Sequence, residues 1–254
     1  NNRRKLIVAL GAGALATPVG SFAQQQDKVW RVGFLAQRNR PDSLDADIYG
    51  AFPRGMRELG YVEGKDLEIQ WRYAEGKIER LPGLAAELVQ LKVDVLVAAE
   101  TPAVRAAQKV TTTIPIVMTL AGDPVGTGLV KSLARPGGNI TGLSNFVGDI
   151  SPKLLDMMRS VVPKLARVAV LVNPANPAYT ATVKGVQDAA GRIGVQALVI
   201  EARTAPEIEN AFATMVREKS GAVIVQPEGL FIQQRSQIAK LAVRWMAWKA
   251  MTTH

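Results

Sequence analysis

The stretch that decides the fold is VDVLVAAETPAVRAA, residues 93–107. Its apolar run 93–98 has the length and composition of a buried strand. An alanine-rich helix is predicted to begin at once, with Thr101 as the N-cap and Pro102 at the first helical position, where a missing N–H costs nothing. A strand that leads straight into a helix brings a hydroxyl and unpaired backbone N–H groups to one point. Such an arrangement favours anions.

The same strand-to-helix unit recurs along the chain. Strands are predicted at 29–36, 67–72, 93–98, 115–119, 140–143, 168–172, 195–201 and 222–225. Helices are predicted at 44–59, 78–90, 125–134, 152–162 with Ser151 as cap, 178–193, 205–219 with Thr204 as cap, and 230–247, besides the helix after residue 101. Strands that alternate with helices form parallel sheets.

A crossing point is predicted at residues 144–150, after which the alternation restarts. The predicted fold class is therefore α/β, with two Rossmann-like lobes, parallel sheets and a hinge. We place the N-terminal lobe at 29–145 and the C-terminal lobe at 146–254. In such folds ligands bind at the carboxyl ends of the strands, so the functional residues are expected in the loops that follow them.

Residues 1–23 have the pattern of an export signal that is cleaved after Ala23. Arg3, Arg4 and Lys5 give a positive start, and an apolar run follows, too short to span a membrane comfortably. Within this segment, KLIVALGAGALA (5–16) imitates the dinucleotide-binding G-x-G-x-x-A fingerprint. Pro18, Gly20 and three glutamines follow it in place of a βαβ unit, so no cofactor is predicted.

Composition excludes several classes of function. The chain of 254 residues contains no cysteine, and its one histidine is the last residue, His254. Cysteine catalysis, zinc–thiolate sites and a Ser-His-Asp mechanism are therefore not expected, and no metal site is predicted. The formal net charge is +9, of which Arg3, Arg4 and Lys5 contribute +3; from residue 24 onward the basic residues are dispersed among acidic ones without a basic run. Nucleic-acid binding, which needs a basic patch, is therefore not expected.

The candidate ligand-binding residues lie in the loops after the strands, and each also has an ordinary structural interpretation. The Thr101 hydroxyl either binds a ligand carboxylate or only caps a helix. Asp123 either pairs with a ligand ammonium group or caps the helix predicted after Pro124. Asn145 either lines the floor of the cleft or shapes the hinge. The full set is Gln37, Ser43, Thr101, Asp123, Asn145, Asn173, Tyr179 and Glu228.

Several segments together resemble a known family. They are GFL (33–35), LGYVEG (59–64), TPA (101–103), IPIV (114–117), DPV (123–125), GLV (128–130) and RPGGNITG (135–142). In this order they resemble the substrate-binding proteins of ABC transporters with the periplasmic binding protein type 1 fold, in the group that includes tryptophan- and tyrosine-binding members. The resemblance runs from about residue 29 to about 241. The tail 244–254 matches nothing expected there, so the second lobe is expected to be incomplete.

The resemblance implies an exported, periplasmic solute receptor without enzymatic activity. It would bind a small organic ligand, such as an amino acid, between its lobes and dock on the permease subunits of an ABC importer. No cofactor, no nucleic acid and no membrane insertion of the mature chain are expected. Two alternatives remain open: a ligand-sensing domain for a signalling partner, and an isomerase or transferase on the same fold.

Overall fold

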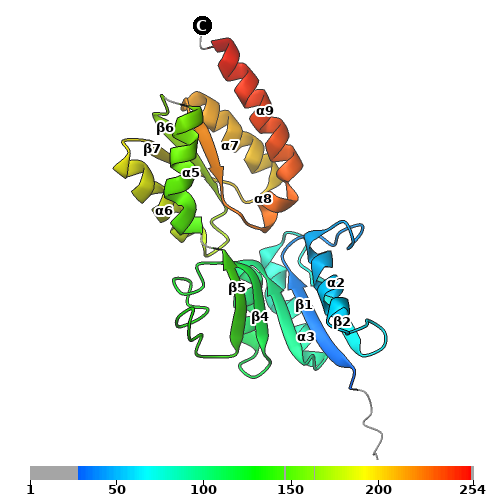
Figure 1. Ribbon diagram of the computed structural model, residues 1–254. Coiled ribbons are helices and arrows are strands. Elements are labelled where there is room, and N and C mark those ends of the chain that lie inside the picture. Colours follow the sequence, from blue (N-terminus) through cyan, green and yellow to red (C-terminus); the bar gives the residue numbers. More distant parts are fainter. Residues whose placement is uncertain (1–27, 146, 163, 253–254) are drawn as a thin grey trace, which may run out of the picture.

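The computed structural model describes residues 28–145, 147–162 and 164–252. The predicted export signal and its G-x-G-x-x-A segment lie outside these residues. The described chain forms two α/β lobes, one above the other in Figure 1. The chain passes from the first lobe to the second between β5 and α5, at the predicted crossing point.

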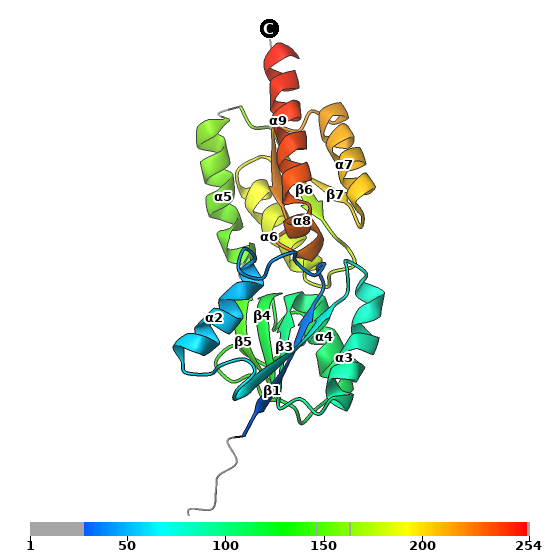
Figure 2. The ribbon, with the colours of Figure 1, turned by 90° about the vertical axis from the view of Figure 1, so that its right-hand side faces the viewer.

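The first lobe is built on a five-stranded sheet with the strand order β2-β1-β3-β4-β5, in which all pairs are parallel. The strands are β1 (Trp30–Ala36), β2 (Leu67–Tyr73), β3 (Val95–Ala99), β4 (Ile116–Gly122) and β5 (Ile140–Asn145). Their helices and 3₁₀ turns are η1 (Ile48–Gly50), α2 (Ala51–Glu58), η2 (Ile78–Arg80), α3 (Leu81–Gln90) and α4 (Glu100–Val110). Helices α3 and α4 cover one face of the sheet and α2 lies on the other (Figure 2).

Strand β1 shows why the central strands of this sheet are largely apolar. Leu35 packs into the cluster beneath α3 and α4, whereas Val32 and Phe34 pack into the cluster beneath α2. Successive side chains of a strand point to opposite faces, so a strand covered on both sides must be apolar at nearly every position. This is the origin of the continuous apolar runs that predicted the strands.

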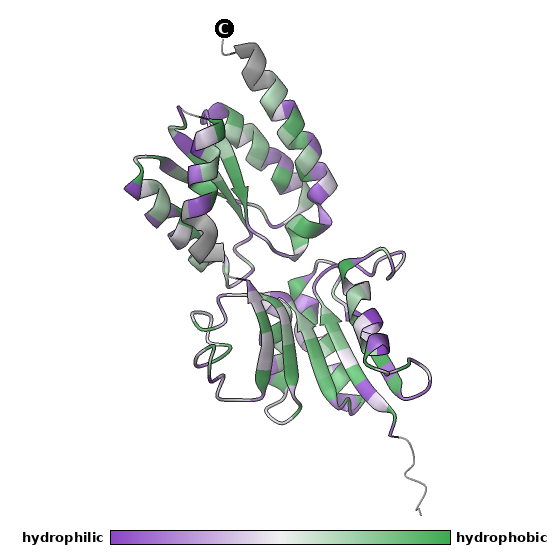
Figure 3. Cartoon of the chain, viewed as in Figure 1, coloured by the Kyte–Doolittle hydropathy of each residue, from purple (hydrophilic) through white to green (hydrophobic). Residues whose placement is uncertain are grey.

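The second lobe has a three-stranded parallel sheet with the order β7-β6-β8. Its strands are β6 (Arg167–Val172), β7 (Gln196–Glu201) and β8 (Ala222–Val225). Its helices are α5 (Val147–Val161), α6 (Tyr179–Arg192), α7 (Ala205–Arg217), α8 (Gly229–Gln233) and α9 (Arg235–Thr252). In Figure 3 the strands are mostly hydrophobic, and the helices carry polar and apolar residues on different sides.

Three helix predictions in the second lobe can be compared with the structure. The Thr204 cap is confirmed, because its Oγ1 accepts a bond from the Glu207 backbone N–H and the Glu207 carboxylate reaches back to Arg203 N. The predicted cap at Ser151 is wrong, because α5 begins four residues earlier, at Val147. The helix predicted over 230–247 is two helices, separated at Gln234.

Two predictions in the first lobe are also wrong. The segment 44–59 forms η1 and α2 only from Ile48 onward. The segment 125–134 is a series of turns and not a helix. Gly128 has a φ of +73°, a conformation that ends a helix, and the Thr127 N–H is bonded to the Asp123 carbonyl oxygen in a single turn. A glycine on both sides of Thr127 favours this turn over a helix.

Gly142 of β5 is a position where only glycine fits. Its φ is +133°, and an added Cβ would lie 2.1 Å from the carbonyl oxygen of Met118 on β4. We expect Gly142→Ala to lower the free energy of unfolding by at least about 2 kcal/mol, because both strain and a backbone clash must be relieved. Urea denaturation measures this change in the free energy of unfolding. The control is Gly138→Ala, where a Cβ meets nothing within 4 Å; equal effects of the two changes would contradict the prediction.

Candidate functional site

The carboxyl ends of the two sheets face each other, and side chains from both lobes meet there. Gln37 follows β1 and its Nε2 lies 3.5 Å from Oε2 of Glu228, which follows β8. The backbone N–H of Asn39 lies 3.4 Å from Oε1 of Gln233 on α8. An added Cβ at Gly122, the last residue of β4, would lie 2.8 Å from the Cβ of Ala178. The site predicted from strand ends is therefore a contact between lobes.

The first lobe contributes a buried ionic network. The Tyr49 hydroxyl donates to Glu100 Oε1 over 2.9 Å, and the Arg38 guanidinium lies against both, with Nε 3.3 Å from the Tyr49 oxygen and 3.9 Å from Glu100 Oε1. Asp47 holds the other side of Arg38, with 2.8 Å between Nη2 and Oδ1. Glu100 is 1% exposed. A buried charge needs partners of this kind.

The second lobe contributes an amide and carboxylate group after β6 and β8. Glu228 Oε1 accepts from the Phe231 backbone N–H over 3.0 Å and so caps α8. Asn173 Nδ2 lies 3.3 Å from Glu228 Oε2, and Gln226 Oε1 accepts from the Asn173 backbone N–H over 2.9 Å. Asn173, Gln226 and Glu228 are buried.

Gly229, the first residue of α8, lies directly over the first-lobe network. A Cβ on Gly229 would lie 3.1 Å from Cδ of Gln37, 3.3 Å from Oε2 of Glu100 and 3.4 Å from Cγ of Arg38. Two buried oxygens at this place, Gln37 Oε1 and Glu100 Oε2, have no hydrogen-bond donor among the described residues. These two oxygens are buried where Gly229 packs on the first lobe.

Burial raises the pKa of Glu100 to about 7. The hydrogen bond from Tyr49 and the charge of Arg38 oppose this rise, and repulsion from Glu228 adds to it. Burial also raises the pKa of Glu228 above its ordinary value, although backbone N–H groups of Phe231 and Leu230 favour its ionised form. The site is thus a poor environment for two negative charges without a further cation.

Comparison with known proteins gives the family. The sequence profile of the ABC transporter substrate binding protein family matches residues 37–240. The chain belongs to this family. It is also 28% identical, over 208 residues, to a tyrosine-binding protein of Clostridioides difficile. That alignment covers 82% of the chain and 59% of the relative's length, so the chain spans less than two thirds of that curated relative.

Solved structures confirm the periplasmic binding protein type 1 fold of this substrate binding protein. A conserved domain protein from Vibrio cholerae is 27% identical, with a TM-score of 0.78, and the match covers 86% of this chain and 72% of that one. An ABC domain from Streptococcus pneumoniae, solved in complex with L-Trp, is 23% identical with a TM-score of 0.76; the match covers 85% and 71% of the two chains. The fold class and the family resemblance inferred from the sequence are thereby confirmed.

In this substrate binding protein Thr101 is not the helix cap. The N-cap of α4 is Ala99, and Thr101 is the second residue of the helix. The Thr101 hydroxyl oxygen accepts from Gly122 N over 2.9 Å and lies 3.4 Å from Gly122 O. This bond joins the first turn of α4, just after β3, to the last residue of β4; Thr101 and Gly122 are 21 residues apart in the sequence. This bonding leaves Thr101 1% exposed, so its predicted role with a ligand stays a prediction.

Of the other predicted residues, some meet in the contact between the lobes and the rest lie outside it. Gln37, Asn173 and Glu228 meet in the contact between the lobes. Asp123 Oδ1 accepts from Gly126 N over 2.9 Å and caps a turn, since the helix predicted there is absent. Ser43 is exposed in the loop before η1, Asn145 Nδ2 lies 3.5 Å from the Leu120 carbonyl oxygen, and Tyr179 packs against the apolar cluster of the second lobe.

Sequence reasoning missed Glu100, Arg38 and Tyr49. Glu100 lies within residues 93–107, between the predicted buried strand and the predicted helix, where a charged residue is unusual. It also has a φ of +70°, which is uncommon for a residue with a side chain. The position of a charged residue at the end of an apolar strand was the sequence signal that could have identified Glu100. Arg38 and Tyr49 lie around a loop whose course only the structure reveals.

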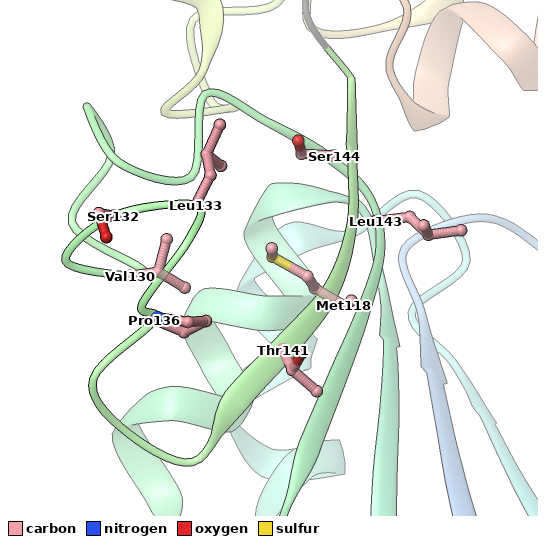
Figure 4. A pocket seen from close by; sticks show the side chains of 9 residues that line it. Met118, Val130, Ser132, Leu133, Pro136, Thr141, Leu143 and Ser144 are labelled. Atoms are coloured by element: carbon pink, nitrogen blue, oxygen red, sulfur yellow. The ribbon is translucent and has the colours of Figure 1, made fainter.

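A separate hollow lies at the edge of the first sheet (Figure 4). It has a volume of about 290 Å³ and lies beside β4 and β5 and the loop 130–136. Its lining residues are Met118, Val130, Ser132, Leu133, Pro136, Thr141, Gly142, Leu143 and Ser144, none of which is charged. The contact between the lobes, with its buried charges, is the better candidate for recognition of a polar solute.

Neither a metal site nor a membrane-spanning helix is found in the part of the chain that the structure describes. Within residues 28–145, 147–162 and 164–252, no group of three or more His, Asp or Glu side chains is placed to hold a metal ion. No helix in these ranges is both long and apolar enough to cross a membrane.

Proposed function

We propose that this chain is the solute receptor of an ABC transporter and that it binds a small organic ligand, with an amino acid as the leading candidate, between its two lobes. Gln37, Asn173 and Glu228 would contact the ligand, with Thr101, Asp123, Asn145, Ser43 and Tyr179 around them. The observation that carries this proposal is the bond between Gln37 and Glu228, which joins the carboxyl ends of two parallel sheets in a member of this family.

The arrangement suits reversible capture of a solute. The lobes are linked through the crossing between β5 and α5, so each sheet can move as a unit about that crossing. Among the described residues, the side-chain hydrogen bonds given between the lobes are long, 3.4 and 3.5 Å, so separating the lobes would break only weak bonds there. A ligand that bonds to both lobes would then favour the closed arrangement over the open one.

The proposal includes the cellular location of the protein, the periplasm, and its partners, the permease subunits of an importer. The export-signal pattern of residues 1–23 supports secretion, and the family supports docking of the closed form on the permease subunits of an importer. The receptor itself would carry out no covalent chemistry. The tyrosine-binding relative supports aromatic amino acids as the first ligands to test.

Binding of free amino acids to the purified chain is the direct test. We expect at least one of L-tyrosine, L-tryptophan, L-phenylalanine and L-leucine to bind saturably in isothermal titration calorimetry. At one hundred times its dissociation constant the ligand should stabilise the fold by about 2.7 kcal/mol, which raises the melting temperature. If none of these solutes produces heat or a thermal shift, the proposal of an amino-acid receptor is wrong.

A matched pair of variants tests whether the ligand binds between the lobes. Asn173→Ala removes a buried amide next to Glu228, whereas Asn210→Ala removes an exposed amide on α7. We expect the first variant to weaken binding about tenfold or more and the second to leave it unchanged, because only the first leaves a polar partner unpaired at the contact. Equal affinities for both variants would place the ligand elsewhere.

A further inference from the structure

Glu100 belongs to the first lobe, but one of its carboxylate oxygens is covered by the second. Its Oε1 accepts from the Tyr49 hydroxyl, whereas its Oε2 is buried and has no hydrogen-bond donor among the described residues. Gly229 of α8 packs directly on this oxygen, since a Cβ there would lie 3.3 Å from Oε2. When the lobes meet, Oε2 therefore loses contact with water, and no hydrogen bond replaces the lost hydration.

The charges around Glu100 do not balance. Arg38 lies 3.9 Å from Glu100 Oε1, but its other side is paired with Asp47 over 2.8 Å. Glu228 faces Glu100 from the second lobe, and its repulsion adds to the rise in the pKa of Glu100. The Tyr49 hydroxyl stays neutral, because burial raises its pKa. With every carboxylate ionised, the group would hold one cation and three anions in a place that water screens poorly.

Separation of the lobes would remove this imbalance. Arg38, Asp47 and Tyr49 all precede the crossing between β5 and α5, so they stay with Glu100 in the first lobe. Glu228 and α8 follow the crossing and move away with the second lobe. An ionised Glu100 is therefore tolerated when the lobes are apart, whereas the closed arrangement favours a Glu100 that carries a proton.

We propose that closure of the two lobes is coupled to protonation of Glu100, so that the ligand-free protein closes with a proton on this carboxyl and opens when the proton leaves. The proposal rests on the lobe movement in the function proposed above and adds a control by pH. The proton is exchanged with the solvent, and the O–H bond of Glu100 is the one covalent bond that forms or breaks. A single charge can decide the outcome because the side-chain hydrogen bonds given between the lobes are long, 3.4 and 3.5 Å.

The direction of the pH dependence follows from proton counts. In the closed structure the pKa of Glu100 is about 7. Access of water to Oε2 and the departure of Glu228 lower this pKa in the open state. Between the two pKa values the closed form binds more protons than the open form, so a rising pH favours opening. The closing equilibrium constant falls by about tenfold for each pKa unit that separates the two states.

Fluorescence energy transfer between one dye on each lobe measures closure of the ligand-free protein. The chain contains no cysteine, so Lys65→Cys in the first lobe and Ser236→Cys on α9 give two exposed positions for labelling. We expect the closing equilibrium constant to fall reversibly by about threefold or more between pH 5.5 and pH 8. A transfer efficiency that is equal at both pH values would overturn the proposal. Binding of amino acids without this change would leave the receptor function intact, and the change without binding would overturn only that function.

Variants tie the effect to the named carboxylates. Glu100→Gln keeps the shape of the side chain and cannot ionise, so this variant should stay closed from pH 5.5 to pH 8. Glu228→Gln removes the repulsion across the contact and should reduce the change with pH. Glu58→Gln, at an exposed glutamate of α2, is the control and should respond to pH as the wild type does.

Small-angle X-ray scattering of the unlabelled proteins gives a second measurement. The radius of gyration of the wild type should be larger at pH 8 than at pH 5.5, and that of Glu100→Gln should be the same at both. A pH dependence that persists undiminished in Glu100→Gln, or in Glu228→Gln if the first variant does not fold, would overturn the assignment to this carboxyl.

Discussion

Replacing Glu100 with glutamine is expected to raise the free energy of unfolding of the ligand-free protein by about 3 kcal/mol at pH 8. The native pKa of this carboxyl is about 7 because it is buried, against 4.5 for an unperturbed glutamate. Ionising it in the folded state therefore costs more than ionising it in the unfolded chain. Glutamine keeps an acceptor for the Tyr49 hydroxyl and removes the charge.

The direction of the pH dependence follows from proton counts. Between pH 4.5 and pH 7 the folded protein holds a proton on Glu100 that the unfolded chain has lost, so stability falls as the pH rises through this range. Below about pH 4.5 both states are protonated and the variant should equal the wild type. Above about pH 7 the difference should be complete and constant.

Urea denaturation at pH 4, 6 and 8 measures this difference. Comparison of variant with wild type at each pH removes the contributions of the carboxylates that do not interact with Glu100; Glu228 does interact with it. Glu58→Gln, at an exposed glutamate of α2, is the control and should change stability by less than about 0.5 kcal/mol at every pH. A Glu100→Gln effect that is the same at pH 4 and pH 8 would show that this carboxyl does not titrate near pH 7.

Truncation of Leu171 to alanine is expected to lower the free energy of unfolding by about 3–4 kcal/mol. Leu171 lies in β6, the central strand of the second sheet, in register with Ile200 on β7 and Val225 on β8. It is 0% exposed and packs in the cluster with Phe212 and Trp245 beneath α7 and α9. The change removes three buried carbon atoms and leaves a cavity that neighbours on both sides can only partly close.

Far-UV circular dichroism during urea denaturation measures this loss of stability. The control is Leu143→Ala in β5, since Leu143 is 75% exposed and should cost less than about 0.5 kcal/mol. A cost below about 1 kcal/mol for Leu171→Ala would mean that the second sheet is not packed as the structure shows.

Strands were the easiest elements to predict, because a strand covered on both faces leaves a local signature. Each residue of 168–172 must be apolar, and no other part of the chain is needed to recognise that. Turns such as 125–134 were harder, since alternating glycine and small residues permit either a weak helix or a series of turns. The Asp123 and Gly128 backbone conformations decide between them.

The meeting of Gln37, Asn173 and Glu228 between the lobes could be expected from the order of the strands, whereas contacts that depend on the path of a loop could not. Asn173 directly follows β6 and Glu228 lies three residues after β8, so the parallel topology brings both to one edge. The partner of Thr101 is Gly122, which the local pattern around Thr101 cannot reveal. Likewise, the partners of Glu100 are Arg38 and Tyr49, whose positions depend on the path of a loop after β1.

The separation of apolar strand centres from polar strand ends affects how this substrate binding protein can evolve. Changes at Leu35 or Leu171 threaten the fold of a whole lobe, whereas the side chains that meet between the lobes begin only after each strand has ended. Selection can therefore alter the recognised solute through short loop segments while the sheets stay the same. A laboratory library confined to exposed loop positions after the strands, such as Arg40, Asp42 and Ser43, would vary these loops with little loss of folded protein.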